Sequence, residues 1–151
     1  MDVRPYLPTD RDACLAVFDS NAPEFFLPRE RAEYERFLDD PSGPYFVMDH
    51  DGLIAGCGGY YVIGGEPTRA RMAWGMVLRE WQRKGLGRLL LMYRLRQITK
   101  AGGVQFVGLD TSQRSAPFFQ SQGFKVAGIA ADGYGPGLDR VEMAMKLNVC
   151  P

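Results

Sequence analysis

One stretch of the chain, residues 74–88, limits most strongly what the protein can form. An apolar run through Val77 and Leu78 ends, a basic turn with two glycines follows, and a leucine-rich helical pattern begins at once. The first turn of a helix has unpaired backbone N–H groups and the positive end of the helix dipole, so it attracts anions. Gly85 and Gly87 have no Cβ, so a phosphate can approach the backbone closely there. The stretch therefore predicts a strand, a phosphate-binding turn and a helix.

The residues around this turn indicate a pyrophosphate site. Arg83, Lys84 and Arg88 place positive charge beside it, and charge-assisted hydrogen bonds are the strong ones. Two common phosphate motifs are excluded, because the chain has no Gly-x4-Gly-Lys-Ser/Thr run and Leu90 stands where a dinucleotide fingerprint has its third glycine. What remains is Gln-x-x-Gly-x-Gly at residues 82–87, directly after a strand.

Length and charge narrow the possible partners. The chain has 151 residues, which suits a single domain over residues 1–151. Lys plus Arg and Asp plus Glu both number 18, so the net charge is zero and gives no general reason to bind nucleic acid or an anionic membrane. No apolar run approaches the roughly 20 residues that span a bilayer, and the N-terminus lacks the layout of a secretion signal. We expect a cytoplasmic protein without nucleic-acid or membrane partners.

The cysteines and the histidine do not predict a metal or a nucleophilic site. Cys14, Cys57 and Cys150 have neither zinc-site nor redox-pair spacing. The single histidine, His50, lies in an Asp-His-Asp-Gly sequence that predicts a hairpin turn, a poor place for a catalytic triad. We expect ordinary thiols and no metal.

Hydrophobic periodicity and turn signals predict an alternation of strands and helices. Gly75 is a candidate bulge in the strand before the phosphate turn. The segment 132–138 contains so many glycines that it predicts irregular structure. The remaining elements are strands at 3–7, 45–48, 53–63, 69–78, 104–109, 124–129 and 140–147, and helices at 9–20, 28–38, 86–100 and 115–122. A strand, helix, strand order around the phosphate turn implies a right-handed parallel crossover.

This order of elements, together with the Gln-x-x-Gly-x-Gly segment, resembles the GNAT superfamily of N-acetyltransferases. The segment from Ser112 to Phe124 is also similar to a family pattern, Asn-x-x-Ala-x-x-apolar-Tyr-x-x-x-Gly-Phe. The resemblance covers nearly the whole chain. It implies an α+β fold with a central mixed, mostly antiparallel sheet, a parallel strand pair splayed at the cofactor site, and helices on both faces.

The resemblance also implies the cofactor and the residues that hold it. The cofactor would be acetyl-coenzyme A, released as coenzyme A, without a metal. Its pyrophosphate would lie on the turn, and its pantetheine arm between the splayed strands. The implied binding residues are Met76, Val77, Leu78, Gln82, Arg83, Lys84, Gly85, Leu86, Gly87, Arg88, Ser112, Phe118 and Phe119.

In such an enzyme an amine attacks the thioester directly. The backbone amide of Val77 would stabilise the acyl oxygen as it gains negative charge. A base must accept the proton of the amine, and Glu24, Asp110 and Tyr134 are alternatives. Phe119 stands where the family often has a tyrosine that acts as general acid, so the group that protonates the departing thiolate is open. Ser112 likewise replaces a frequent asparagine.

Three functions compete at this point. The first is an N-acetyltransferase that transfers an acetyl group to a primary amine of a small molecule or peptide. The resemblance also makes a homodimer an option, but no residue pattern in the chain predicts it. The second is a non-catalytic module of the same fold that senses acyl-coenzyme A, an alternative supported by Phe119. The third is nucleic-acid binding by the arginines of residues 79–96, against which the zero net charge and the lack of aromatic–basic interleaving argue.

Overall fold

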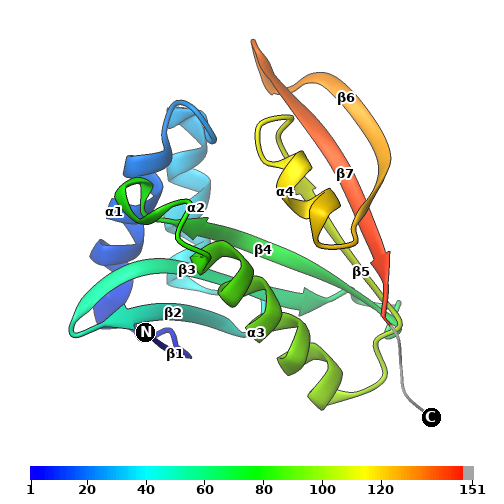
Figure 1. The fold of residues 1–151 in the computed structure, drawn as a ribbon, viewed down its shortest axis with the longest axis horizontal. Coiled ribbons are helices and arrows are strands. Elements are labelled where there is room, and N and C mark those ends of the chain that lie inside the picture. Colours follow the sequence, from blue (N-terminus) through cyan, green and yellow to red (C-terminus); the bar gives the residue numbers. More distant parts are fainter. Residues whose placement is uncertain (148–151) are drawn as a thin grey trace.

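The computed structural model describes residues 1–147, and Cys150 therefore lies outside the described residues. Strands and α-helices alternate along the chain (Figure 1). They are β1 (Asp2–Pro5), α1 (Arg11–Asn21), α2 (Arg31–Asp39), β2 (Tyr45–His50), β3 (Leu53–Val62), β4 (Arg69–Val77), α3 (Leu86–Ala101), β5 (Phe106–Thr111), α4 (Ala116–Ser121), β6 (Lys125–Gly135) and β7 (Leu138–Lys146). Short 3-10 turns η1 (Pro8–Asp10), η2 (Pro28–Glu30) and η3 (Arg79–Trp81) precede α1, α2 and the phosphate turn.

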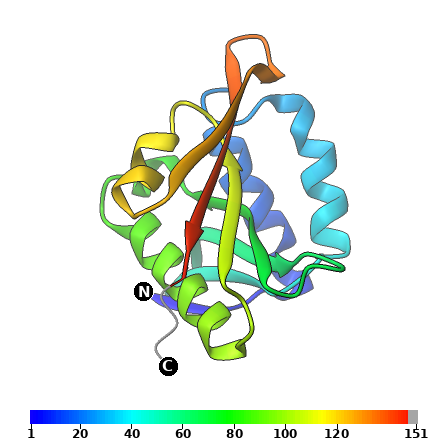
Figure 2. The same cartoon turned by 90° about the vertical axis from the view of Figure 1, so that its right-hand side faces the viewer.

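The strands form one mixed sheet in the order β1-β2-β3-β4-β5-β7-β6. All neighbours are antiparallel except β4 and β5, which are parallel. Helices α1 and α2 cover one face of the β1–β4 half, and α3 and α4 lie on the opposite side of the sheet (Figures 1 and 2). The predicted α+β class, with a mostly antiparallel mixed sheet and helices on both faces, is confirmed.

The parallel pair opens along its length. Residues Arg69–Arg71 of β4 pair with Phe106–Gly108 of β5, and no pairing follows beyond them. Strand β4 nevertheless continues to Val77 and β5 to Thr111, so their carboxyl ends diverge (Figure 1). The predicted splay is confirmed, and it leaves backbone N–H and C=O groups on both strands facing a gap.

The predicted bulge lies in β4 beside Gly75. Met76 pairs with Cys57 of β3 and Ala73 pairs with Gly59, so β4 has one residue more than β3 between these two pairs. Trp74 has a φ of 45°, in the left-handed region that a bulky residue rarely adopts. A bulge bends its strand and increases the local twist. This bend carries the end of β4 away from β5.

The sequence predicts irregular structure at 132–138, and this prediction is wrong, because the segment forms most of a β-hairpin turn. Strand β6 runs to Gly135, β7 begins at Leu138, and the register shifts between Ala130 and Gly135. Two carboxylates support this irregular hairpin: the Asp132 N–H donates to Asp139 Oδ1 at 2.9 Å, and Asp132 Oδ1 accepts the Gly137 N–H at 2.8 Å. The glycines thus accompany a bulged, extended hairpin.

Each face of the sheet has its own hydrophobic cluster. On the α3–α4 side, Leu91 and Ile98 pack against Val107 and Met143. On the α1–α2 side the cluster includes Val17, Phe18, Tyr34, Val47 and Cys57, all of which are fully buried. Each buried Val, Leu, Ile, Phe or Met side chain contributes about 1.5–3 kcal/mol through burial. Within residues 1–147, no helix is both long enough and apolar enough to cross a membrane.

Candidate active site

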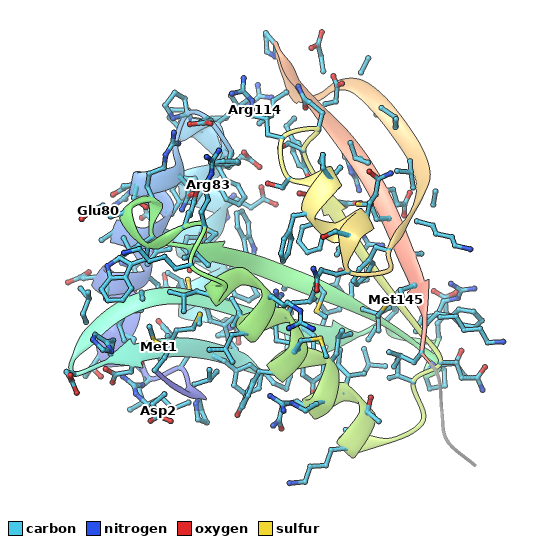
Figure 3. All side chains as sticks on the ribbon, in the orientation of Figure 1. Met1, Asp2, Glu80, Arg83, Arg114 and Met145 are labelled. Atoms are coloured by element: carbon cyan, nitrogen blue, oxygen red, sulfur yellow. The ribbon has the colours of Figure 1, made fainter. Side chains whose placement is uncertain are left out.

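A cavity of ≈ 1180 Å³ occupies the gap between the diverging ends of β4 and β5. Its walls come from both strands, the first turns of α3, helix α4, helix α2 with the loop before it, and the tip of the β6–β7 hairpin. Arg83 and Arg114, labelled in Figure 3, lie on the side where the strands diverge, whereas Met145 lies where the sheet is paired. The volume is sufficient for a large cofactor together with a second small ligand.

The phosphate turn has the conformation that the sequence predicts. Gly85 has a φ of 80° and caps α3, and Arg83 before it has a φ of 63°. No side chain caps the first turn of α3, so its amides are free to bind a ligand. A Cβ on Gly87 would lie 3.5 Å from the Phe118 ring, so the absent side chain leaves open space on the cavity wall. Free amides, open space and flanking arginines fit a pyrophosphate.

The Gln82 side chain forms hydrogen bonds with groups of the protein itself. Its Nε2 donates to Asn21 Oδ1 at 2.6 Å and to the Val77 carbonyl at 3.1 Å. Asn21 is 3% exposed, and its Nδ2 donates to the same Val77 carbonyl at 2.9 Å. The end of α1, the end of β4 and the phosphate turn are therefore joined by one hydrogen-bonded unit. The motif predicts Gln82 at the cofactor site, but its partner in α1 is not visible in the motif.

The other predicted cofactor residues separate into two groups. Met76, Val77, Arg83, Gly85, Gly87, Arg88, Ser112, Phe118 and Phe119 line the cavity. Leu78, Lys84 and Leu86 are not among its lining residues: Lys84 Nζ lies 5.2 Å from the centre of the Trp81 ring, and Leu78 packs against the α1–α2 cluster. Ser112 is buried, and its Oγ accepts the Arg114 N–H at 3.3 Å, which holds the loop before α4.

The three alternative bases have different surroundings. Glu24 pairs with Arg79 and is not among the cavity-lining residues. Asp110 lines the cavity between two guanidinium groups, with Oδ1 2.9 Å from Arg71 Nη2 and Oδ2 2.7 Å from Arg140 Nη2. Tyr134 also lines the cavity, and burial, followed by the negative charge of Asp110, raises the pKa of its phenol, so it keeps its proton at neutral pH.

Two acids that the sequence analysis did not single out, Glu30 and Glu33, lie on the same wall. Glu30 Oε2 accepts the Leu27 N–H at 2.8 Å, and burial raises the pKa of this carboxyl. No ion pair of Glu30 is found within residues 1–147. The sequence contains a signal for this role of Glu30. Pro28 is typical of the first residue of a helical turn, and an acid two residues later can accept the backbone N–H before the turn.

The half of the cavity away from the phosphate turn has an aromatic wall and a charged rim. Phe26 and Phe37 pack against the bulged Trp74, with ring centres 6.1 and 6.3 Å apart from it. Arg29 on η2 donates to the Tyr134 carbonyl and so joins this wall to the β6–β7 hairpin. A second ligand would therefore enter between α2 and the hairpin, opposite the phosphate turn.

The fold places a helix start with uncapped amides beside the point where two parallel strands diverge. Residues 14–124 match the model of the acetyltransferase (GNAT) family, which is more than half of the chain. The chain belongs to this family, and the predicted GNAT fold is confirmed. A search of curated proteins finds no match.

Solved structures agree on the fold. The ribosomal-protein-S18-alanine N-acetyltransferase from Escherichia coli is 20% identical, with a TM-score of 0.82 over 99% of this chain and 96% of that one. An aminoglycoside 6'-N-acetyltransferase complexed with coenzyme A is 15% identical, with a TM-score of 0.79 over 100% and 98%. Ard1 from Thermoplasma volcanium is 16% identical, with a TM-score of 0.79 over 97% of both chains. These similarities concern the fold alone.

Proposed function

We propose that the protein is an N-acetyltransferase that transfers an acetyl group from acetyl-coenzyme A to a primary amine of a small molecule or peptide. The observation that carries this proposal is that one continuous cavity connects three parts of the site. They are the free amides of the α3 turn, the end of β4, and the wall with acidic and aromatic side chains. One opening can therefore hold a diphosphate at one end and an amine at the other.

When bound, acetyl-coenzyme A supplies an acyl group activated as a thioester. The amides of residues 85–88, with Arg83 and Arg88, would bind its pyrophosphate. Phe118 and Phe119 on α4 would pack along the pantetheine arm, opposite Met76 on β4. All three side chains line the cavity.

The backbone of Val77 is oriented for the acyl oxygen. The Leu78 N–H donates to the Ala55 carbonyl of β3, and successive residues of a strand point their N–H groups to opposite sides. The Val77 N–H therefore points into the gap beside β5. Asn21 and Gln82 both donate to the Val77 carbonyl, which holds the adjoining peptide unit between Val77 and Leu78. A fixed donor aimed at a developing negative charge stabilises the transition state.

Glu30 is the acid that we assign as the proton acceptor, in preference to Glu24, Asp110 and Tyr134. Burial raises the pKa of its carboxyl, and a carboxylate with a higher pKa is a stronger base. Asp110 is engaged by Arg71 and Arg140, and Tyr134 holds its proton. The Tyr134 phenol is then a candidate donor for the departing thiolate, since Phe119 has no proton to give.

A transfer assay with a panel of amines tests the function. Purified protein with acetyl-coenzyme A and an amine is expected to release free thiol and to give a product heavier by one acetyl group. The panel should include amino acids, peptides with free N-termini, aminoglycosides and polyamines.

A second candidate function is a non-catalytic sensor of acyl-coenzyme A. It is supported by Phe119, which stands where the family often has a tyrosine that acts as general acid. Calorimetric binding of acetyl-coenzyme A separates the two functions: binding without transfer to any amine supports the sensor, and absence of binding contradicts both.

A further inference from the structure

Arg94 is a buried cation on the wall of the cavity. The side chain lies in the middle of α3, is 3% exposed, and lines the cavity together with Leu90. Burial lowers the pKa of its guanidinium to about 10, so it remains charged at neutral pH. A buried charge is costly unless it is paired.

Within residues 1–147, Arg94 forms no ion pair with a carboxylate. Its Nε donates to the Leu90 carbonyl at 3.4 Å, and its Nη1 donates to the Gly59 carbonyl at 3.3 Å. Both bonds are long, and no hydrogen bond from Nη2 is found in this part of the chain. The guanidinium thus has donor capacity that the protein leaves unused.

The guanidinium lies directly beneath the bulge of β4. A Cβ on Gly75 would approach Arg94 Nη2 to 2.9 Å, and a Cβ on Gly58 would approach its Cζ to 3.2 Å. Glycines at both positions therefore make room for this charge. Arg94 is nine residues beyond Gly85, or about 14 Å along the helix, which is too far to serve the pyrophosphate. It is close to the strand segment that ends at the Val77 amide.

We propose that Arg94 binds a carboxylate at the far end of the acyl group, so that the preferred donors are coenzyme A thioesters of short dicarboxylic acids, such as malonyl- or succinyl-coenzyme A. This inference rests on the proposed function and refines its donor. An acetyl group ends in a methyl, which would leave the charge unpaired. A terminal carboxylate would accept from Nη1 and Nη2 together, the geometry that guanidinium groups favour.

The chemistry of transfer is otherwise unchanged. The amine nitrogen forms a bond to the thioester carbonyl carbon, the C–S bond breaks, and its electron pair leaves with sulfur. The amine proton passes to the base, and the terminal carboxylate is not altered. The product is an amide that carries a new negative charge, so this reaction would convert a cationic amine into an anionic group.

The decisive measurement compares donors of equal length that differ in charge. Calorimetry measures the affinity of the wild-type protein for succinyl-coenzyme A and for butyryl-coenzyme A. This comparison requires neither a variant nor catalytic turnover. We expect the succinyl thioester to bind about tenfold more tightly or better, as a hydrogen-bonded charge pair would give. Equal affinities, or tighter binding of the butyryl thioester, would overturn the inference.

Variants assign the preference to this side chain. Arg94→Met is expected to remove the succinyl preference and to leave butyryl binding within about twofold. Arg94→Lys should retain part of the preference. Arg96→Met changes an exposed arginine of the same helix and serves as the matched control. If Arg94→Met weakens both donors equally, Arg94 merely fills the space under the glycines. If Arg94→Met does not fold, the wild-type comparison decides alone.

The inference and the proposed function fail in different ways. Transfer from acetyl-coenzyme A but not from succinyl-coenzyme A supports the function and contradicts the inference. A succinyl preference in binding without transfer from any donor supports the inference and favours the sensor.

Discussion

The carboxylates of the cavity differ in their neighbours, and the neighbours determine what each can do. Asp110 is within ion-pair distance of Arg71 and Arg140, so its lone pairs are directed at positive groups. Glu30 accepts a single backbone hydrogen bond, and burial raises its pKa. A base must have a free lone pair and a pKa that is not too low. These requirements select Glu30.

Replacing Glu30 with Gln should lower kcat by about a hundredfold, the usual effect of losing a general base. The amide oxygen can still accept the Leu27 N–H, so the fold should persist. In the wild-type protein, kcat/KM should fall as the pH drops through the pKa of Glu30, because the base works only when ionised. This pKa lies above the ordinary glutamate value, so the fall should begin at a higher pH than for a solvent-exposed acid.

The pH profile of Glu30→Gln supplies the check. The acidic fall in kcat/KM should disappear in this variant and persist in Glu33→Gln, which changes the other acid of the same wall. A kcat for Glu30→Gln within twofold of wild type would assign the base elsewhere.

Gly87→Val should weaken coenzyme A binding by tenfold or more without unfolding the protein. The Cβ site has ordinary contact distance to Phe118, so the protein itself accepts a side chain there. The added methyl groups would fill the space beside the free amides of α3. Calorimetry gives the affinity, and Gly128→Val, at a position with nothing within 4 Å of its Cβ site, is the control. Unchanged affinity for Gly87→Val would move the pyrophosphate away from this turn.

Helix α1 and strand β4 are joined at the site by an asparagine. Asn21 donates to the carbonyls of Val17 and Val77 and accepts from Gln82, so it links the two elements to the phosphate turn. The Val77 carbonyl is thereby held by the nearby Gln82 and by Asn21, which is distant in the sequence. A buried polar unit of this kind rigidifies a site when every member is paired.

Asn21→Asp should be more damaging than Asn21→Ala, although it is closer in shape. The carboxylate cannot donate to either carbonyl and would place an uncompensated negative charge against two oxygen atoms. Asn21→Ala loses hydrogen bonds and should cost about 1–3 kcal/mol of unfolding free energy. Chemical denaturation of both variants measures the difference. Greater stability of Asn21→Asp would mean that the carbonyls are solvated.

The sequence was sufficient for those parts of the site that depend on local backbone. The Gln-x-x-Gly-x-Gly segment predicts the turn between β4 and α3, and Gly75 predicts the bulge of β4. Contacts between segments that are distant in the sequence could not be predicted from it. They are the contact of Asn21 with Val77, the arginines around Asp110, and the position of Glu30 on the cavity wall. The prediction of irregular structure at 132–138 was wrong. Glycine-rich segments occur both in loops and in bulged hairpins, and here two aspartates accept backbone N–H groups of the hairpin.

The molecule as a whole consists of two parts whose strands pair over only three residues, although α3 packs against strands of both parts through Leu91 and Ile98. Strands β1–β4 with α1–α3 form one part, and β5–β7 with α4 form the other (Figure 1). The parallel pairing of Arg69–Arg71 with Phe106–Gly108 joins them within the sheet, and the Arg29 to Tyr134 contact joins them across the cavity. A ligand that touches both α3 and α4 therefore bridges the two parts.

Coenzyme A should stabilise the whole molecule through this bridge. At a free concentration of one hundred times Kd, binding adds about 2.7 kcal/mol to the free energy of unfolding, which for a domain of this size raises Tm by about 5–10 °C. Amide exchange should slow in β5 beyond Gly108 and in the first turn of α3, and should stay unchanged in β1. Gly87→Val should retain its ligand-free Tm and lose the shift. If coenzyme A instead protects β1 and β2 alone, the ligand binds away from the splayed strands, and the division into two bridged parts is wrong.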